Sequence, residues 1–287
     1  MKKINIHLAS FLGLILLITS FFTPILAPLI KLNTDTIFRL INSYLIAYFA
    51  YMISFMDTKK VLLLFLPLLT FTIINLFIVN GLTPKINKDL VTDIYLNIRN
   101  FYDLIGLVGV FFLIEFLSNR IFGNTFTSIL GILCLGIFFY FDYSKLLNSI
   151  VNFKDMFLYF SVYVMALRVR AANKINPLLY ILAIVLLIGE IYINKRFSLN
   201  YGYLVSFLAI IYLVLKQIRN PQELTFEKFM IFVYIYIFPS VYLALNSFVI
   251  TDTSIILVLA SLITFFIGQI LFYFKIKFIN YIFVGIN

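Results

Sequence analysis

Apolar stretches long enough to cross a lipid bilayer recur along this chain from end to end, and they constrain its fold more than any other feature. The mean hydropathy is +1.07, and charged residues make up only 12% of the chain. A soluble domain carries about 25% charged residues, because its surface must face water. The sequence therefore predicts an all-α, polytopic integral membrane protein, with residues 1–287 forming a single transmembrane domain.

The apolar segments predict about ten transmembrane helices joined by short loops. In residue numbers these segments are 8–30, 38–56, 61–82, 103–118, 126–141, 155–167, 177–193, 199–215, 229–250 and 254–274. Between the third and fourth segments, apolar residues recur at helical spacing from Leu90 to Tyr102, which is typical of a helix lying in the headgroup plane. The turn from Thr251 to Ser254 is short, so the last two helices are expected to be antiparallel neighbours.

The sixth segment decides the orientation of everything that follows it. It is short for a helix that must supply roughly 20 residues to span, so it either borrows residues 146–153 or forms a re-entrant hairpin. Lys and Arg collect in cytoplasmic loops. With ten spans and the N-terminus inside, 13 of the 22 basic residues lie in inner loops, and without the sixth span only 7 do. We therefore expect ten spans with both termini cytoplasmic.

Composition also narrows the function. The net charge of +10 would suggest nucleic acid in a soluble protein, but here the basic residues lie between apolar segments, where they meet membrane lipids. One histidine, His7, and one cysteine, Cys134, cannot build a zinc site or an internal disulfide. No phosphate-binding, dinucleotide-binding or hydrolase motif is present. The sequence predicts no catalytic residues, no cofactor, no metal and no nucleic acid partner, in a bacterial inner membrane or an organellar one.

Among the charged residues, Glu115 is the strongest candidate for a functional role. It lies in the fourth segment, about five residues or roughly 8 Å from the predicted inner end. Charge inside a membrane is costly and usually marks a pathway or a proton site. We treat Glu115 as a candidate proton or cation site, while Asn119 and Arg120 offer ordinary partners for its carboxylate.

The second segment holds the clearest pattern in the sequence. Its small residues follow a spacing of 4, 3 and 4, and an aromatic row follows the same spacing one position later: Ser43, Ala47, Ala50 and Ser54, then Tyr44, Tyr48, Tyr51 and Phe55. Small stripes let membrane helices approach closely, so a tight helix contact is favoured. The alternative is a hydroxyl-lined pathway, to which Asn42 would add an amide.

Two further places are candidates for binding. Pro239 falls near the middle of the ninth segment, with Asn246 seven residues later on the same face. A broken helix with free carbonyls and a nearby amide is how many transporters form a site. Arg168, Arg170 and Lys174 cluster in one inner loop, where they either set the topology or contact anionic lipid, a phosphorylated ligand or a cytoplasmic protein such as an ATPase.

Three classes of function fit these features. Ten helices in fewer than 300 residues with both ends inside resemble the layout of drug/metabolite transporters, which implies a permease for a small solute or lipid, with a mid-membrane cavity lined by the second, fourth and ninth helices. A non-catalytic membrane subunit of a larger complex predicts no cavity and an uncovered face of small residues. An enzyme acting on a lipid-linked substrate predicts polar residues meeting at one interface, such as Asp35, Arg39 or Asp103. We favour the transporter, then the subunit.

Overall fold

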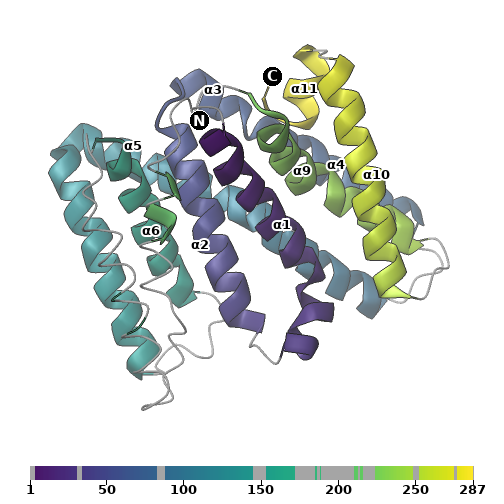
Figure 1. The fold of residues 1–287 in the computed structure, drawn as a ribbon, viewed down its shortest axis with the longest axis horizontal. Helices are drawn as coiled ribbons and strands as arrows, with labels where there is room; N and C mark the ends of the chain where they lie inside the picture. The colour runs from purple at the N-terminus through teal and green to yellow at the C-terminus, as the bar shows by residue number, and fades with distance from the viewer. Residues whose placement is uncertain are drawn as a thin grey trace. The chain divides into compact units, whose positions relative to one another are not determined.

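The computed structural model describes the chain in separate stretches. These are residues 4–30, 34–82, 88–144, 153–171, 185, 188, 210–212, 214–215, 224–247, 252–274 and 277–286. Within these residues the regular structure is helical and there is no strand (Figure 1). Most of the predicted seventh and eighth segments lies outside the described residues, and so does Lys174.

The chain divides into two compact units. Unit 1 comprises Met1–Ala9, Leu32–Phe55 and Val108–Pro221, and unit 2 comprises Ser10–Lys31, Met56–Leu107 and Gln222–Asn287. Two long helices contribute residues to both units: α1 (Ile4–Ile30) and α5 (Lys88–Ser144). The two units are described separately below.

Unit 1 is organised around two helices that pack against each other, α2 (Thr34–Ile53) and α6 (Phe153–Ala171). From Ser43 to Ile53 every side chain of α2 is buried. Of the two alternatives for the sixth segment, the re-entrant hairpin would need a break in the helix, and α6 runs unbroken for 19 residues. Helix α6 is not among the described stretches that are long and apolar enough to cross a membrane, so its span stays a prediction.

Helix α5 bends sharply at Gly123, which lies between the predicted fourth and fifth segments. Gly123 has φ +79° and ψ 172°, a conformation that only glycine adopts easily. Thr127 donates a hydrogen bond to Asn119 across this point, at 2.6 Å. Residues eight apart in a straight helix lie roughly 12 Å apart along its axis, so this bond requires the chain to turn back.

Unit 2 contains five further helices. They are α3 (Thr58–Leu63), α4 (Leu66–Leu82), α9 (Phe226–Ser247), α10 (Thr253–Phe274) and α11 (Lys277–Phe283). Helix α9 contacts α4, α10 and α11, and its residues from Lys228 to Ser240 are all buried. Its Tyr236 hydroxyl also donates a hydrogen bond to the Leu64 carbonyl between α3 and α4.

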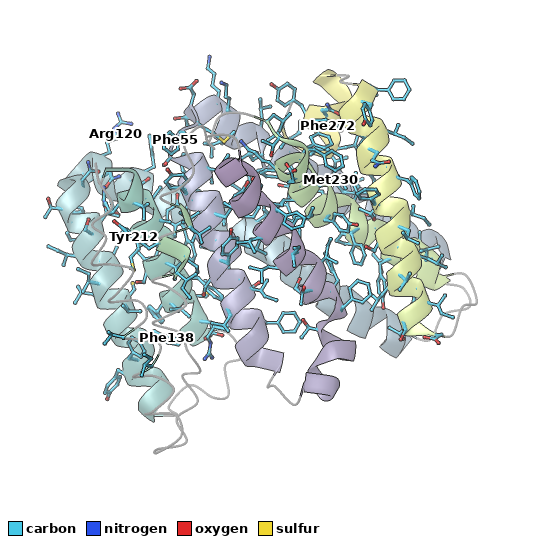
Figure 2. The ribbon with its side chains drawn as sticks, in the orientation of Figure 1. Phe55, Arg120, Phe138, Tyr212, Met230 and Phe272 are labelled. Atoms are coloured by element: carbon cyan, nitrogen blue, oxygen red, sulfur yellow. The ribbon has the colours of Figure 1, made fainter. Side chains whose placement is uncertain are left out.

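Helices α9 and α10 are antiparallel neighbours, as the short turn between them predicts. Their contacts pair Tyr234 with Ser261, Met230 with Gly268 and Phe226 with Phe272. In these pairs the residue numbers rise along one helix as they fall along the other. Figure 2 labels Met230 on α9 and Phe272 on α10. A Cβ atom on Gly268 would lie 2.5 Å from the sulfur of Met230, so glycine is what allows this close packing. Asp252 caps α10 by accepting a 2.8 Å hydrogen bond from the Ser254 amide.

Four stretches of the described helices are long and apolar enough to cross a membrane: Thr58–Asn75, Ile105–Tyr140, Phe226–Asn246 and Thr253–Phe274. Shorter apolar helices run over Ala9–Thr23 and Phe38–Ile53. The protein is therefore an all-helical, membrane-associated protein with several candidate spans. The ten-span count, the side on which the termini lie and the single-domain organisation stay predictions.

Candidate functional site

A chain of hydrogen bonds links polar side chains inside the apolar stretch of α5. The Thr127 hydroxyl donates to the Asn119 side-chain carbonyl at 2.6 Å, and the Asn119 amide donates to the Glu115 carboxylate. The Asn119 amide is therefore the donor to Glu115, and Thr127 donates to Asn119 behind it. The turn at Gly123 brings Thr127 back beside Asn119, so the local backbone conformation creates this arrangement. Of the two partners that the sequence offers to Glu115, Asn119 is the one that it uses.

Helix α6 supplies the positive charge of this cluster. The Arg168 guanidinium donates a 2.7 Å hydrogen bond to the backbone carbonyl of Asn124, the residue after the turn. Helices α5 and α6 also pack closely at Gly131. A Cβ atom on Gly131 would lie 3.0 Å from the side chain of Val164. Arg168 also lies close enough to Glu115 for their charges to interact. The structure thus brings together two residues that the sequence placed in separate candidate sites.

Arg168 and Glu115 are near each other without forming a direct ion pair between their described side chains. The Arg168 Nε atom is buried and has no hydrogen-bond partner among the described residues. The Tyr163 hydroxyl, fully buried on α6, likewise has none within that part of the chain. Its ring contacts Phe111, one helical turn before Glu115, with ring centroids 5.8 Å apart. Two buried donors therefore lie near the carboxylate, close enough for their charges to interact with it. We call Glu115, Asn119, Thr127, Tyr163 and Arg168 the α5–α6 polar cluster.

The other end of α6 carries a second group of charges, which are directly paired. Arg39 of α2 forms an ion pair with Asp155, with Nε and Oδ1 3.0 Å apart. Both side chains are about one-eighth exposed, at 12% and 13%. The Arg39 guanidinium also lies over the Phe138 ring, 5.4 Å from its centroid. One turn along each helix, the Asn42 amide donates a 3.4 Å hydrogen bond to the Tyr159 hydroxyl. These contacts hold α2 against α6.

The rows of small and aromatic residues in the second segment are mostly buried, and their described hydroxyls mostly donate hydrogen bonds to backbone carbonyls. Tyr44 donates a 2.7 Å hydrogen bond to the Ala9 carbonyl, and Ser54 donates to the Tyr51 carbonyl at 2.6 Å. The rings of Tyr44 and Tyr48 stack with centroids 6.5 Å apart. Ser43 is fully buried, and its hydroxyl has no partner in the described part of the chain. These contacts fit the predicted tight helix contact, while the pathway alternative stays untested.

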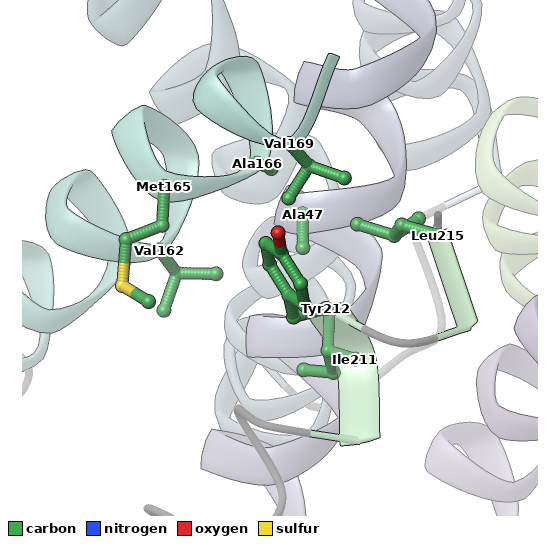
Figure 3. A pocket seen from close by; sticks show the side chains of 8 residues that line it. All are labelled: Ala47, Val162, Met165, Ala166, Val169, Ile211, Tyr212 and Leu215. Carbon is green, nitrogen blue, oxygen red and sulfur yellow. The ribbon is translucent and has the colours of Figure 1, made fainter. Parts of the chain in front are cut away.

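A small cavity lies beside these rows in unit 1. Its volume is about 20 Å³, which is room for one water molecule. Figure 3 shows the side chains that line it: Ala47 from α2, Val162, Met165, Ala166 and Val169 from α6, and Ile211, Tyr212 and Leu215. Except for the Tyr212 hydroxyl these walls are apolar. The cavity is too small for a solute. Of the three helices expected to line a transport pathway, only α2 is among its described walls.

Pro239 and Asn246 both lie on α9, which belongs to unit 2. The residues of the α5–α6 polar cluster belong to unit 1. Helix α9 continues through Pro239 to Ser247. The next residue, Ser240, donates a 2.6 Å hydrogen bond to the Asn75 side-chain carbonyl of α4, and both residues are buried. The polar contact near the proline thus joins two helices, and Asn246 is only partly buried.

The remaining candidates are less informative. Arg170 is helical at the end of α6, Asp35 in α2 and Asp103 in α5, but their side chains are not among those described. Arg120 is exposed and projects outward near the turn (Figure 2). Among the described residues, no group of three or more His, Cys, Asp or Glu side chains could hold a metal ion.

Sequence reasoning missed Tyr163, Thr127 and the carbonyl of Asn124. One signal was present: Asp155, Tyr159 and Tyr163 are four residues apart and share one face of α6. The Gly123-Asn124 pair was a second signal, because such dipeptides favour turns. What the sequence could not supply is the contact of α6 with that turn.

No family model, no curated protein and no solved structure matches this chain.

Proposed function

We propose that this protein is a membrane transporter or permease for a small solute or lipid, and that the α5–α6 polar cluster is part of its pathway. The observation that carries the proposal is the Glu115 carboxylate, which lies within an apolar helical stretch, with the Arg168 guanidinium of α6 near it but not paired with it. Charged groups inside membrane segments are costly, and they mark substrate and ion pathways more often than structural contacts.

The uncovered surfaces of α5 and α10 support this proposal over a subunit of a larger complex. Their exposed residues are mostly large and branched or aromatic, as at Leu113, Ile132, Leu262 and Phe266. Contacts between membrane helices favour small residues, whereas lipid accepts large apolar side chains. We therefore propose lipid as the main neighbour of these faces. Ten spans, cytoplasmic termini and a bacterial inner membrane belong to the same proposal.

Transport into liposomes that contain the purified protein tests this function. The probes are radiolabelled acetate, phosphate, glycine, glucose and choline, together with a fluorescent phospholipid whose movement between leaflets is followed by dithionite quenching. We expect at least one probe to cross faster than in protein-free liposomes, and Glu115→Gln or Arg168→Gln to change that rate.

Arg120→Gln is the matched control, because Arg120 is exposed beside the same turn. It should leave the rate unchanged. If no probe crosses faster than in protein-free liposomes, or if both cluster variants transport like the wild type, the proposal is wrong.

A further inference from the structure

The α5–α6 polar cluster presents hydrogen-bond donors that the described protein does not satisfy. The Arg168 Nε atom and the Tyr163 hydroxyl are both buried and lack partners among the described residues. A buried donor without an acceptor is unfavourable, and native proteins rarely retain one without a reason. Two such donors beside one carboxylate call for a ligand that accepts hydrogen bonds.

The position of Arg168 is fixed in a way that keeps Nε available. Its terminal nitrogen donates to the Asn124 carbonyl at the glycine turn, 2.7 Å away, and so holds one side of the guanidinium. The Glu115 carboxylate already accepts a hydrogen bond from Asn119 and makes no direct ion pair with Arg168 in the described structure. A guanidinium whose Nη2 is anchored while its Nε lacks a partner can still donate from Nε to a carboxylate or phosphate oxygen.

Glu115 then has a defined role. Its negative charge partly balances that of Arg168, which lies near it without a direct ion pair, and it does not occupy the Nε donor. An arriving anion must tolerate this carboxylate, which weakens its binding. Weak binding suits a transport pathway, because the substrate has to leave as well as enter.

We infer that the α5–α6 polar cluster binds a small oxyanion, a carboxylate or phosphate, between the Arg168 Nε atom and the Tyr163 hydroxyl. This inference builds on the proposed transport function by naming its substrate class. The groups that face the site from the two packed helices are Glu115 on α5, with Tyr163 and Arg168 on α6. Arg120 is exposed beside the turn.

Equilibrium dialysis of the purified full-length protein in detergent, with radiolabelled acetate and radiolabelled phosphate, tests the site. We expect saturable binding of at least one probe. Arg168→Gln should weaken it more than tenfold, and Tyr163→Phe about tenfold, because each removes a hydrogen bond to a charged ligand. Glu115→Gln should tighten binding several-fold, because it removes a like charge.

The controls separate a local effect from misfolding. Arg120→Gln and Tyr140→Phe change exposed residues of the same types and should bind like the wild type. If Arg168→Gln fails to fold, Arg168→Lys keeps the positive charge but loses the Nε donor, and binding should still weaken. Circular dichroism checks folding in each case.

The inference is overturned if the folded wild type binds neither probe, if Arg168→Gln or Tyr163→Phe binds normally, or if Glu115→Gln weakens binding. Binding without movement into liposomes would refute the transport function and leave the site intact. Transport of another probe without oxyanion binding would refute the site alone.

Discussion

The two ends of α6 use charge in different ways. At the Asp155 end, the carboxylate and the Arg39 guanidinium touch, and the guanidinium also lies over an aromatic ring. At the Arg168 end, the guanidinium lies near Glu115 but bonds to a backbone carbonyl instead. A direct pair holds opposite charges in contact and fixes helix packing. Charges that lie near each other without pairing leave room for a further partner, and for this reason we propose the site at the Arg168 end.

The largest effect is expected where the charges touch. Arg39→Ala removes the cation that lies 3.0 Å from the mostly buried Asp155 carboxylate, and should lower the free energy of unfolding by about 3 kcal/mol. Cys134, the one cysteine of the chain, is buried, so a thiol-reactive dye reports unfolding in detergent. Removing both charges in Arg39→Ala/Asp155→Ala should recover part of this loss. A loss below about 1 kcal/mol in the single variant would contradict a structural pair.

The next largest effect concerns the turn that anchors Arg168. Gly123→Ala places a Cβ atom at φ +79°, and should lower the free energy of unfolding by about 2 kcal/mol, measured with the same dye. Gly136→Ala is the matched control, because Gly136 is helical and a Cβ atom there meets no atom within 4 Å. That variant should be neutral or stabilising by up to about 1 kcal/mol. Equal effects of the two substitutions would argue against a special turn.

A smaller effect is expected within the hydrogen-bonded chain. Thr127→Val keeps the side-chain shape but removes the donor to Asn119, so it should destabilise the protein by about 1 kcal/mol in the dye assay. Thr125→Val, at an exposed position two residues earlier, should change stability by less than about 0.5 kcal/mol. If the two variants have the same free energy of unfolding, the hydrogen bonds from Thr127 through Asn119 do not hold Glu115 in place.

The smallest effect is expected at Arg120. Its side chain is exposed, so Arg120→Gln should change the free energy of unfolding by less than about 0.5 kcal/mol. Arg168→Gln removes the contact with Asn124 and should cost about 1 kcal/mol or more. The thermal unfolding curves of the two variants, followed by dye labelling, give this comparison. The opposite order would make Arg120 the functional partner of Glu115.

Several features followed from local sequence alone. The apolar runs predicted helices, and α2, α4, α9 and α10 lie where the pattern expects them. The short turn before α10 predicted two antiparallel neighbours, because a few residues cannot carry the chain elsewhere. The spacing on α2 predicted rows of small and aromatic residues, and the stacked rings of Tyr44 and Tyr48 follow it. These are effects of nearest neighbours and of helical periodicity.

The candidate site was decided by tertiary contacts. The sequence singled out Glu115 as a charge in an apolar segment and Arg168 as part of a basic loop, and gave no reason to join them. Their proximity requires a glycine turn in α5 and close packing of Gly131 against Val164 of α6. Periodicity fixes which residues share a face of one helix. Only the packing of helices decides which faces meet, and hence which buried donors are left without an acceptor.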